Sequence, residues 1–126
     1  MGDQVDSLDH AKAVGYYTQA MDVYEKMTEK FPTLKDWCWV AEASVALGKL
    51  KDLDKVRDLY MKVAEYEEAK ADKSDANTKN YLSAAYYFLG YYYAGKNDAE
   101  TSKSYFEKLI QIDSENAEAK KALGLE

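Results

Sequence analysis

The sequence predicts an all-α fold of antiparallel helical hairpins that stack one after another. Ala, Glu, Lys and Leu, which favour helices, recur throughout the chain. One Pro and six Gly in 126 residues are too few for the many turns of a small all-β protein. With 47% hydrophobic and 32% charged residues, the chain has enough material for a core and a solvated exterior, so we expect a single folded domain. A pattern that occurs three times predicts the hairpins.

The repeated pattern consists of two bulky apolar residues, a solvent-type residue, Lys and a further apolar residue. It occupies residues 23–27, 59–63 and 105–109, at start-to-start spacings of 36 and 46 residues. In the first copy Ala20, Tyr24 and Met27 have the i, i+4, i+7 spacing that places side chains on one stripe of a helix. The equivalent stripes of the other copies are Val56, Tyr60 and Val63, and Ser102, Phe106 and Leu109.

Each stripe is preceded by a second candidate helix. The third unit has Tyr86, Leu89, Gly90 and Tyr93 at offsets 0, 3, 4 and 7, and the second unit has Val40, Ala43, Ser44 and Leu47 at the same offsets. Gly90 and Ser44 are predicted to lie where a neighbouring helix comes close, because a larger side chain would push the two helices apart.

The turns between paired helices carry matching residues. Asp52 and Asp98 occupy equivalent positions and are expected to cap the helix that follows, since an Asp side chain accepts hydrogen bonds from free backbone N–H groups. Gly48, Gly95 and Asn97 suit the positive φ angles that such turns need.

The third unit, Tyr86-x2-Leu89-Gly90-x2-Tyr93 followed by Ser102-x3-Phe106, resembles the tetratricopeptide repeat, a helix–turn–helix unit of about 34 residues. The resemblance implies a right-handed α-solenoid of about seven helices. Its repeats would span about 1–34, 37–70 and 83–116, followed by a capping or truncated helix at 117–124. The second unit lacks the final Pro of the pattern. In the first unit Gln4, Ser7, Leu8 and Ala11 replace the expected aromatic residue, Leu, Gly and Tyr.

Two segments lie outside the repeats. Residues 71–82 form an insertion, interpreted either as a lengthening of the flanking helices or as a polar excursion. The N-cap candidates in this segment are Ser74, Asp75, Asn77 and Thr78. The terminal pair Leu125 and Glu126 resembles the remnant of a purification tag, so the chain is interpreted as a possible excised piece of a larger protein. The compartment is therefore left open, with the cytoplasm favoured if the N-terminus is native.

Composition argues against several classes of function. With 17 Lys or Arg and 23 Asp or Glu, the formal charge is −6, and no basic run exists to bind a nucleic acid. No apolar stretch approaches the roughly 20 residues that cross a bilayer, so no membrane insertion is expected. A single cysteine, Cys38, and a single histidine, His10, provide neither an intramolecular disulfide nor a zinc site, and we expect no metal or cofactor.

No catalytic motif is found, so the chain is not expected to be an enzyme. His10 lies in a weakly patterned acidic segment and is predicted to be a solvated surface residue. Cys38 lies between Trp37 and Trp39 and is interpreted as a buried or half-buried apolar thiol.

Protein binding is the better supported class of function. The resemblance implies that the first helix of each repeat lines a concave surface that receives an extended peptide or a partner helix. The Lys and Asn residues with which some family members clamp a partner's C-terminal carboxylate are missing, since Ala41, Val45, Tyr87 and Tyr91 stand in their places. The predicted partner-binding residues are Cys38, Ala41, Val45, Lys49, Ala84, Tyr87 and Tyr91.

We therefore predict a non-catalytic protein-interaction module centred on Tyr87 and Tyr91. Tyr suits recognition surfaces because it offers a large contact area with few rotatable bonds. One alternative is that these tyrosines pack against residues 71–82 or against an omitted repeat. Another is that the chain is a structural spacer or self-association segment of a longer solenoid, with contacts through its terminal repeats, which the incomplete helix at 117–124 favours.

Overall fold

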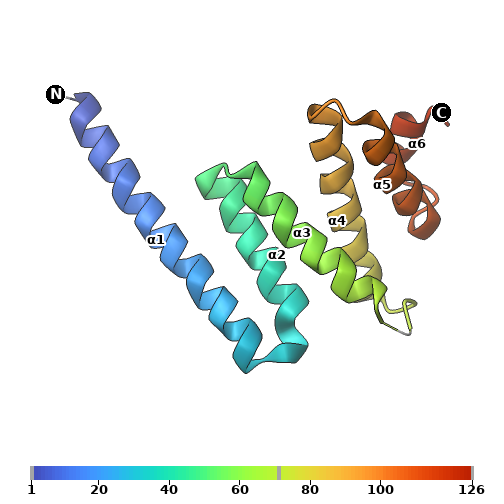
Figure 1. Ribbon diagram of the computed structural model, residues 1–126, viewed down its shortest axis with the longest axis horizontal. Coiled ribbons are helices and arrows are strands. Elements are labelled where there is room, and N and C mark those ends of the chain that lie inside the picture. Colours follow the sequence, from blue (N-terminus) through green and yellow to red (C-terminus); the bar gives the residue numbers. More distant parts are fainter. Residues whose placement is uncertain (1, 71, 126) are drawn as a thin grey trace. The chain divides into compact units, whose positions relative to one another are not determined.

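The computed structural model describes the backbone of residues 2–70 and 72–125, and within these ranges the side chains from residue 10 onward. These residues form six α-helices and no β-strand, which confirms the all-α prediction (Figure 1). The helices are α1 (Gly2–Lys30), α2 (Lys35–Val45), α3 (Leu53–Glu68), α4 (Ala76–Gly95), α5 (Ala99–Ile112) and α6 (Ala117–Leu123), with a 3-10 turn η1 (Pro32–Leu34) and a π-helical turn η2 (Ala46–Leu50). The chain divides into two compact units, Met1–Val56 and Arg57–Glu126.

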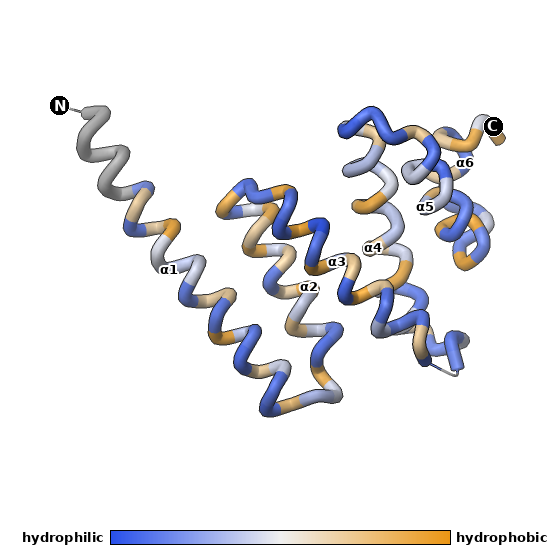
Figure 2. Tube along the Cα trace, in the orientation of Figure 1, coloured by the Kyte–Doolittle hydropathy of each residue, from blue (hydrophilic) through white to orange (hydrophobic). Residues whose placement is uncertain are grey.

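The first unit is a hairpin of α1 and α2. Pro32 begins η1, two residues after the end of α1. Proline has no backbone N–H group, so it cannot continue the hydrogen-bond ladder of the helix. The two helices then run antiparallel, and Tyr24 of α1 meets Trp37 of α2 edge to face at 5.8 Å between ring centroids. Met21 and Cys38 are buried in this unit. Apolar and polar residues are interspersed along α2 and along the coloured part of α1 in Figure 2.

The second unit contains α4, α5 and α6, and most of α3. Gly90 of α4 lies against the Phe106 ring of α5 so closely that a Cβ atom at Gly90 would be 2.7 Å from two ring carbons. The Ser102 hydroxyl donates a hydrogen bond of 2.7 Å to the Gly90 carbonyl oxygen. Ser102, Phe106 and Leu109 are all buried. The predicted close approach at Gly90 and the predicted stripe on α5 are thus confirmed, whereas Ser44 of the second repeat is exposed.

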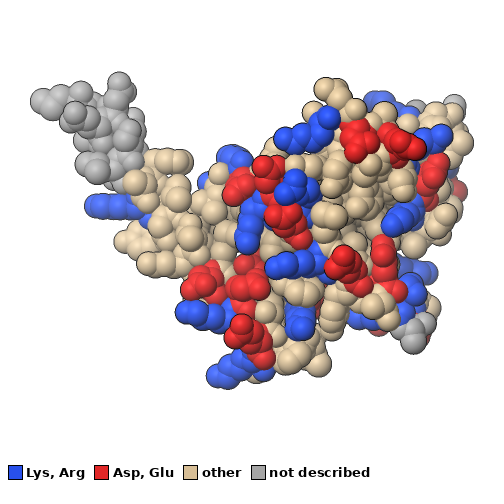
Figure 3. Space-filling model, viewed as in Figure 1, with Lys and Arg blue, Asp and Glu red and all other residues tan. Residues whose placement is uncertain are grey.

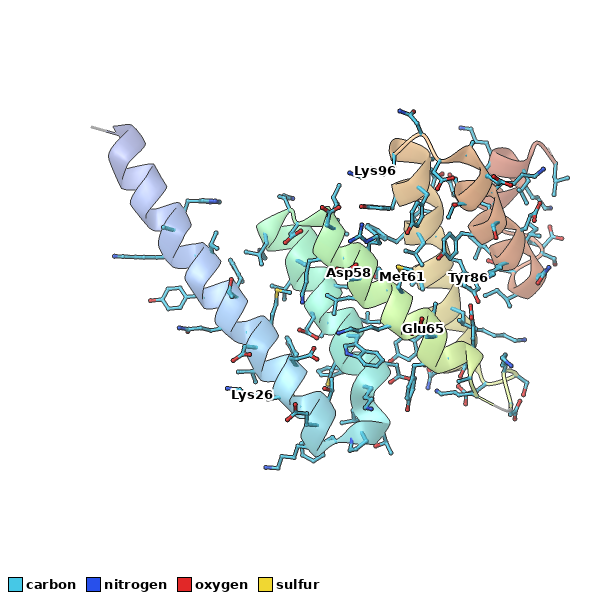
Figure 4. All side chains as sticks on the ribbon, viewed as in Figure 1. Lys26, Asp58, Met61, Glu65, Tyr86 and Lys96 are labelled. Carbon is cyan, nitrogen blue, oxygen red and sulfur yellow. The ribbon has the colours of Figure 1, made fainter. Side chains whose placement is uncertain are left out.

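The aromatic residues of α4 are divided between its two neighbours. Phe88 packs on Tyr60 of α3 at 5.4 Å between ring centroids. Tyr93 stacks on Tyr105 of α5 at 5.8 Å, and Tyr86, labelled in Figure 4, is buried. Several aromatic residues of this helix therefore pack against neighbouring helices, which leaves few of them for recognition.

The turns before α3 and α5 have the same geometry. Lys51 and Asn97 have positive φ angles of 55° and 61° at equivalent positions. Asp52 then accepts a hydrogen bond of 3.1 Å from Lys55 N–H, and Asp98 accepts one of 3.1 Å from the N–H three residues on. Both predicted caps and the predicted role of Asn97 are confirmed. In the second repeat, Lys51 adopts the left-handed conformation that was expected at Gly48.

The first repeat does not form the expected hairpin, because α1 is one continuous helix from Gly2 to Lys30. This is why the described residues contain six α-helices where the repeat pattern implies about seven. At the position equivalent to Asp98 the chain has Tyr16, which cannot cap a new helix. At the position equivalent to Gly90 it has Leu8, where even a Cβ atom would collide with an aromatic ring packed as in the third repeat. The chain thus lacks both features that close the other two turns.

The insertion and the C-terminal segment are now also placed. Residues 1, 71 and 126 lie outside the described residues. Within the insertion, residues 72–75 are not helical, and residues 76–82 are the first turns of α4. Asp75 caps this helix by accepting a hydrogen bond of 2.8 Å from Asn77 N–H. α6 ends at Gly124, whose φ of 69° is that of a helix C-cap.

Candidate partner-binding surface

The candidate surface is centred on two tyrosines of α4. Tyr87 and Tyr91 lie one helical turn apart, and each is 44% exposed. Their rings meet at 5.0 Å between centroids with an angle of 64° between the ring planes, an edge-to-face contact. The predicted exposure of this pair is therefore confirmed.

Tyr91 is held in place by two further contacts. Its ring meets the buried Phe106 ring edge to face, at 5.2 Å and 85°. Its hydroxyl donates a hydrogen bond of 2.5 Å to Glu118 of α6. This hydrogen bond, followed by partial burial and the negative charge of Glu118, raises the pKa of Tyr91 to about 12. The ring is thus fixed from two neighbouring helices while nearly half of it faces solvent.

An open groove of about 570 Å³ begins at Tyr91 and is bounded by α4, α5 and α6. Its lining is largely apolar, with Ala94, Phe106 and Ala122 among the contributors, and Lys103 is the one ammonium group in the lining of the groove. A groove of this size that contains few polar groups can bind an apolar side chain together with some of its flanking backbone.

The predicted site residues are divided between the two units. In the second unit Ala84 is half-buried beside the exposed tyrosines. In the first unit Ala41 and Val45 are half-buried, and Lys49 is exposed with its ammonium group 5.7 Å from the centre of the Tyr17 ring.

Cys38 requires a correction. The Cys38 side chain is 0% exposed, so it is a core residue. The interpretation as a buried thiol is confirmed, and the prediction that Cys38 contacts a partner is wrong. Burial, followed by the negative charges of Glu42, Asp36 and Glu25, raises the pKa of the Cys38 thiol. The thiol is therefore protonated at neutral pH and is a poor nucleophile.

Sequence reasoning missed the contribution of α5 and α6 to this surface. Lys103 lies directly after Ser102 of the core stripe, and Glu118 lies two residues after Asn116, which caps α6. The register of the third repeat and the cap at Asn116 were the available signals. They place both residues near the exposed side of their helices, but the pairing of Glu118 with Tyr91 depends on how α6 packs.

Other kinds of site have little support in the described part of the chain. No group of three or more His, Cys, Asp or Glu residues among the described side chains is placed to hold a metal ion. His10 is exposed, as predicted. The described helices include none that is long and apolar enough to cross a membrane.

Comparison with known families agrees with the geometry of the third repeat. The family model described as tetratricopeptide repeat matches residues 83–116, the segment that contains most of α4 and all of α5. The resemblance is therefore confirmed for this repeat. Comparisons with curated proteins and with solved structures give no match. Tetratricopeptide repeats are generally non-catalytic and take part in protein–protein interaction, so the match at residues 83–116 suggests a protein-interaction module.

Proposed function

We propose that the chain is a non-catalytic protein-interaction module that binds a peptide or helical segment of a protein partner at Tyr87 and Tyr91 and in the adjoining groove. The observation that carries the proposal is the pair of half-exposed, mutually packed tyrosine rings beside an open apolar groove. Rings of this kind bury a large area on binding and are frequent among the residues that dominate binding energy.

The contacts of Tyr91 make the surface well suited to binding. Because Phe106 and Glu118 already hold the ring, little side-chain entropy is left to lose when a partner packs on it. The apolar lining of the groove favours a partner segment with an exposed apolar side chain. Ala84 extends the surface along α4, and Ala41, Val45 and Lys49 remain proposed partner contacts of the first unit.

A chemical-shift titration tests this proposal. The ¹⁵N-labelled full chain is titrated with pools of peptides, each with one apolar residue at its centre. We expect the largest amide shifts at Ala84, Tyr87, Tyr91 and Lys103. Shifts that fall mainly on α1, or no saturable shift with any pool at millimolar concentration, would contradict binding at this surface.

Self-association is a second candidate function, favoured by the exposed face of α1. Tyr16 is 69% and Val23 57% exposed. The stripe of Ala20, Tyr24 and Met27 is only half-buried, whereas the equivalent stripe of the third repeat is buried. A helix whose apolar stripe lacks its usual partner can be covered by a second copy of the chain.

Sedimentation equilibrium distinguishes this candidate from partner binding. A mass that rises from monomer to dimer between about 10 and 500 μM would support self-association, and Val23→Asp should shift the rise to higher concentration by placing a charge in the interface. A constant monomer mass over this range leaves partner binding as the function of the module.

A further inference from the structure

A second groove lies within the first unit, between α1 and the segment from α2 to the first turn of α3. Its volume is about 460 Å³, within the range of about 300–1,000 Å³ typical of ligand pockets. Met21, which is buried, and Leu50, which is half-buried, give it an apolar part. None of the residues that line this groove belongs to the tyrosine surface of α4.

The charged groups of this groove are unbalanced. Four carboxylates line it, those of Asp22, Glu25, Glu42 and Asp52, against the single ammonium group of Lys55. Lys26, on the outer side, pairs with Asp22 at 3.2 Å, and the carboxylates still outnumber the ammonium groups by four to two. Although Figure 3 shows acidic and basic side chains interspersed over the visible face, carboxylates predominate among the residues that line this groove. The Coulomb energy in the groove therefore favours a cationic ligand.

The carboxylates that line the groove also act on the core beside it. Among the causes that raise the pKa of the Cys38 thiol, burial comes first, and the charges of Glu42, Asp36 and Glu25 follow. Two of these three carboxylates line the groove. Their field thus extends into the interior of the hairpin, where it is screened less than at the surface.

The spacing of the carboxylates decides the kind of cation. Among the described residues no three acidic side chains converge closely enough to hold a metal ion. A larger organic cation can contact separated carboxylates, and a guanidinium group presents five N–H donors in a planar fork. Its aliphatic stem can lie along apolar surface such as that of Met21 and Leu50.

We propose that this groove binds an arginine side chain of a partner protein, with its guanidinium group beside the carboxylates of Glu25 and Asp52. The groove is larger than one side chain, so the residues next to the arginine also fit within it. The module would then recognise an arginine-containing segment at its first unit, whether or not a partner also occupies the tyrosine surface.

The test compares two capped Gly-Ser pentapeptides that differ only in their central residue, arginine or its uncharged isostere citrulline. The ¹⁵N-labelled full chain is titrated with each at about 20 mM salt. We expect the arginine peptide to move the amide signals of Thr18, Met21 and Leu50, and the citrulline peptide to leave them in place. Glu25→Gln should lower the affinity of the chain for the arginine peptide about two- to fivefold, as expected for the loss of one ion pair.

Glu29→Gln is the matched control, because Glu29 is an exposed carboxylate one turn along the same helix and does not line the groove. Three results would overturn the proposal: equal shifts with the citrulline peptide, equal weakening by Glu29→Gln and Glu25→Gln, or the same shifts produced by calcium chloride alone. None of these outcomes depends on what binds at Tyr87 and Tyr91, so the two proposals can fail separately.

Discussion

Replacement of Gly90 by Ala should destabilise the α4–α5 hairpin by about 2 kcal/mol. The added Cβ atom would lie 2.7 Å from two carbons of the Phe106 ring and 3.0 Å from a third. Ordinary carbon contacts are about 3.5–4.0 Å, so the helices must separate by about 1 Å, and Phe106 has little room to move because it is buried against Tyr91.

Three effects determine this magnitude. Overpacking of a tightly filled core costs about 1–3 kcal/mol. Separation of the helices also stretches the hydrogen bond from Ser102 to the Gly90 carbonyl oxygen, which is worth about 1 kcal/mol. The better helix propensity of Ala returns about 1 kcal/mol. The net loss is therefore about 2 kcal/mol.

Urea denaturation followed by circular dichroism at 222 nm measures this loss, which corresponds to a midpoint shift of about 1 M for a chain of this size. Gly95→Ala is the control, because no atom lies within 4 Å of its Cβ position and the variant should be as stable as the parent or slightly more stable. If Gly90→Ala is as stable as Gly95→Ala, the close contact with Phe106 does not hold the hairpin together and the reasoning is wrong.

Three further predictions concern a cap, a titration and a helix. Asp98→Ala removes the N-cap of α5 and should lower stability by about 1 kcal/mol in the same urea assay; an unchanged midpoint would contradict the capping role. The pKa of Tyr91 is raised from 10.0 to about 12 in the folded chain, so the stability that its bond to Glu118 contributes is present below pH 10 and is lost as the pH rises through about 12. Since the pKa values of Tyr60, Tyr86 and Tyr105 are raised as well, the measurement is the difference between the 295 nm titrations of the parent and Tyr91→Phe, which should contain one tyrosine that titrates near pH 12. Spin labels at residues 4 and 26, which correspond to Tyr86 and Lys108 of the third repeat, with the native cysteine replaced, should be about 33 Å apart if α1 is one helix, whereas a hairpin would bring them to about 10 Å.

Much of the second unit could be predicted from the sequence because its information is local. The stripe of Ser102, Phe106 and Leu109, the glycine at the close approach and the cap at Asp98 all follow from residue types at fixed offsets. Such features are set by helix geometry and backbone hydrogen bonding, which a single sequence records directly.

The first unit shows where this reasoning failed. The periodicity predicted a hairpin over residues 1–34, but closure of the turn requires a cap and a small residue, and the chain has Tyr16 and Leu8 at those places. Both departures are visible in the sequence, and more attention to the turn chemistry would have predicted the continuous helix.

The composition of the site was only partly predictable. Exposure of Tyr87 and Tyr91 followed from the register of a well-matched repeat, whereas Cys38 was assigned to the surface from a poorly matched one and is buried. The hydrogen bond between Tyr91 and Glu118 depends on the packing of α6 against α4 and α5. Contacts between helices are set by tertiary packing, which the spacing of residues along one helix does not determine.

Recognition of a partner by the tyrosine surface of α4 can be tested with a peptide selected from a random library on the parent chain. Isothermal titration calorimetry then measures the affinity of this peptide for the parent chain, for Tyr87→Ala and for Tyr16→Ala. Each variant removes one exposed tyrosine, from α4 and α1 respectively. We expect Tyr87→Ala to weaken binding by at least about fivefold and Tyr16→Ala to leave the affinity unchanged. Equal affinities for both variants, or a loss only with Tyr16→Ala, would show that the peptide is not recognised by the tyrosine surface of α4.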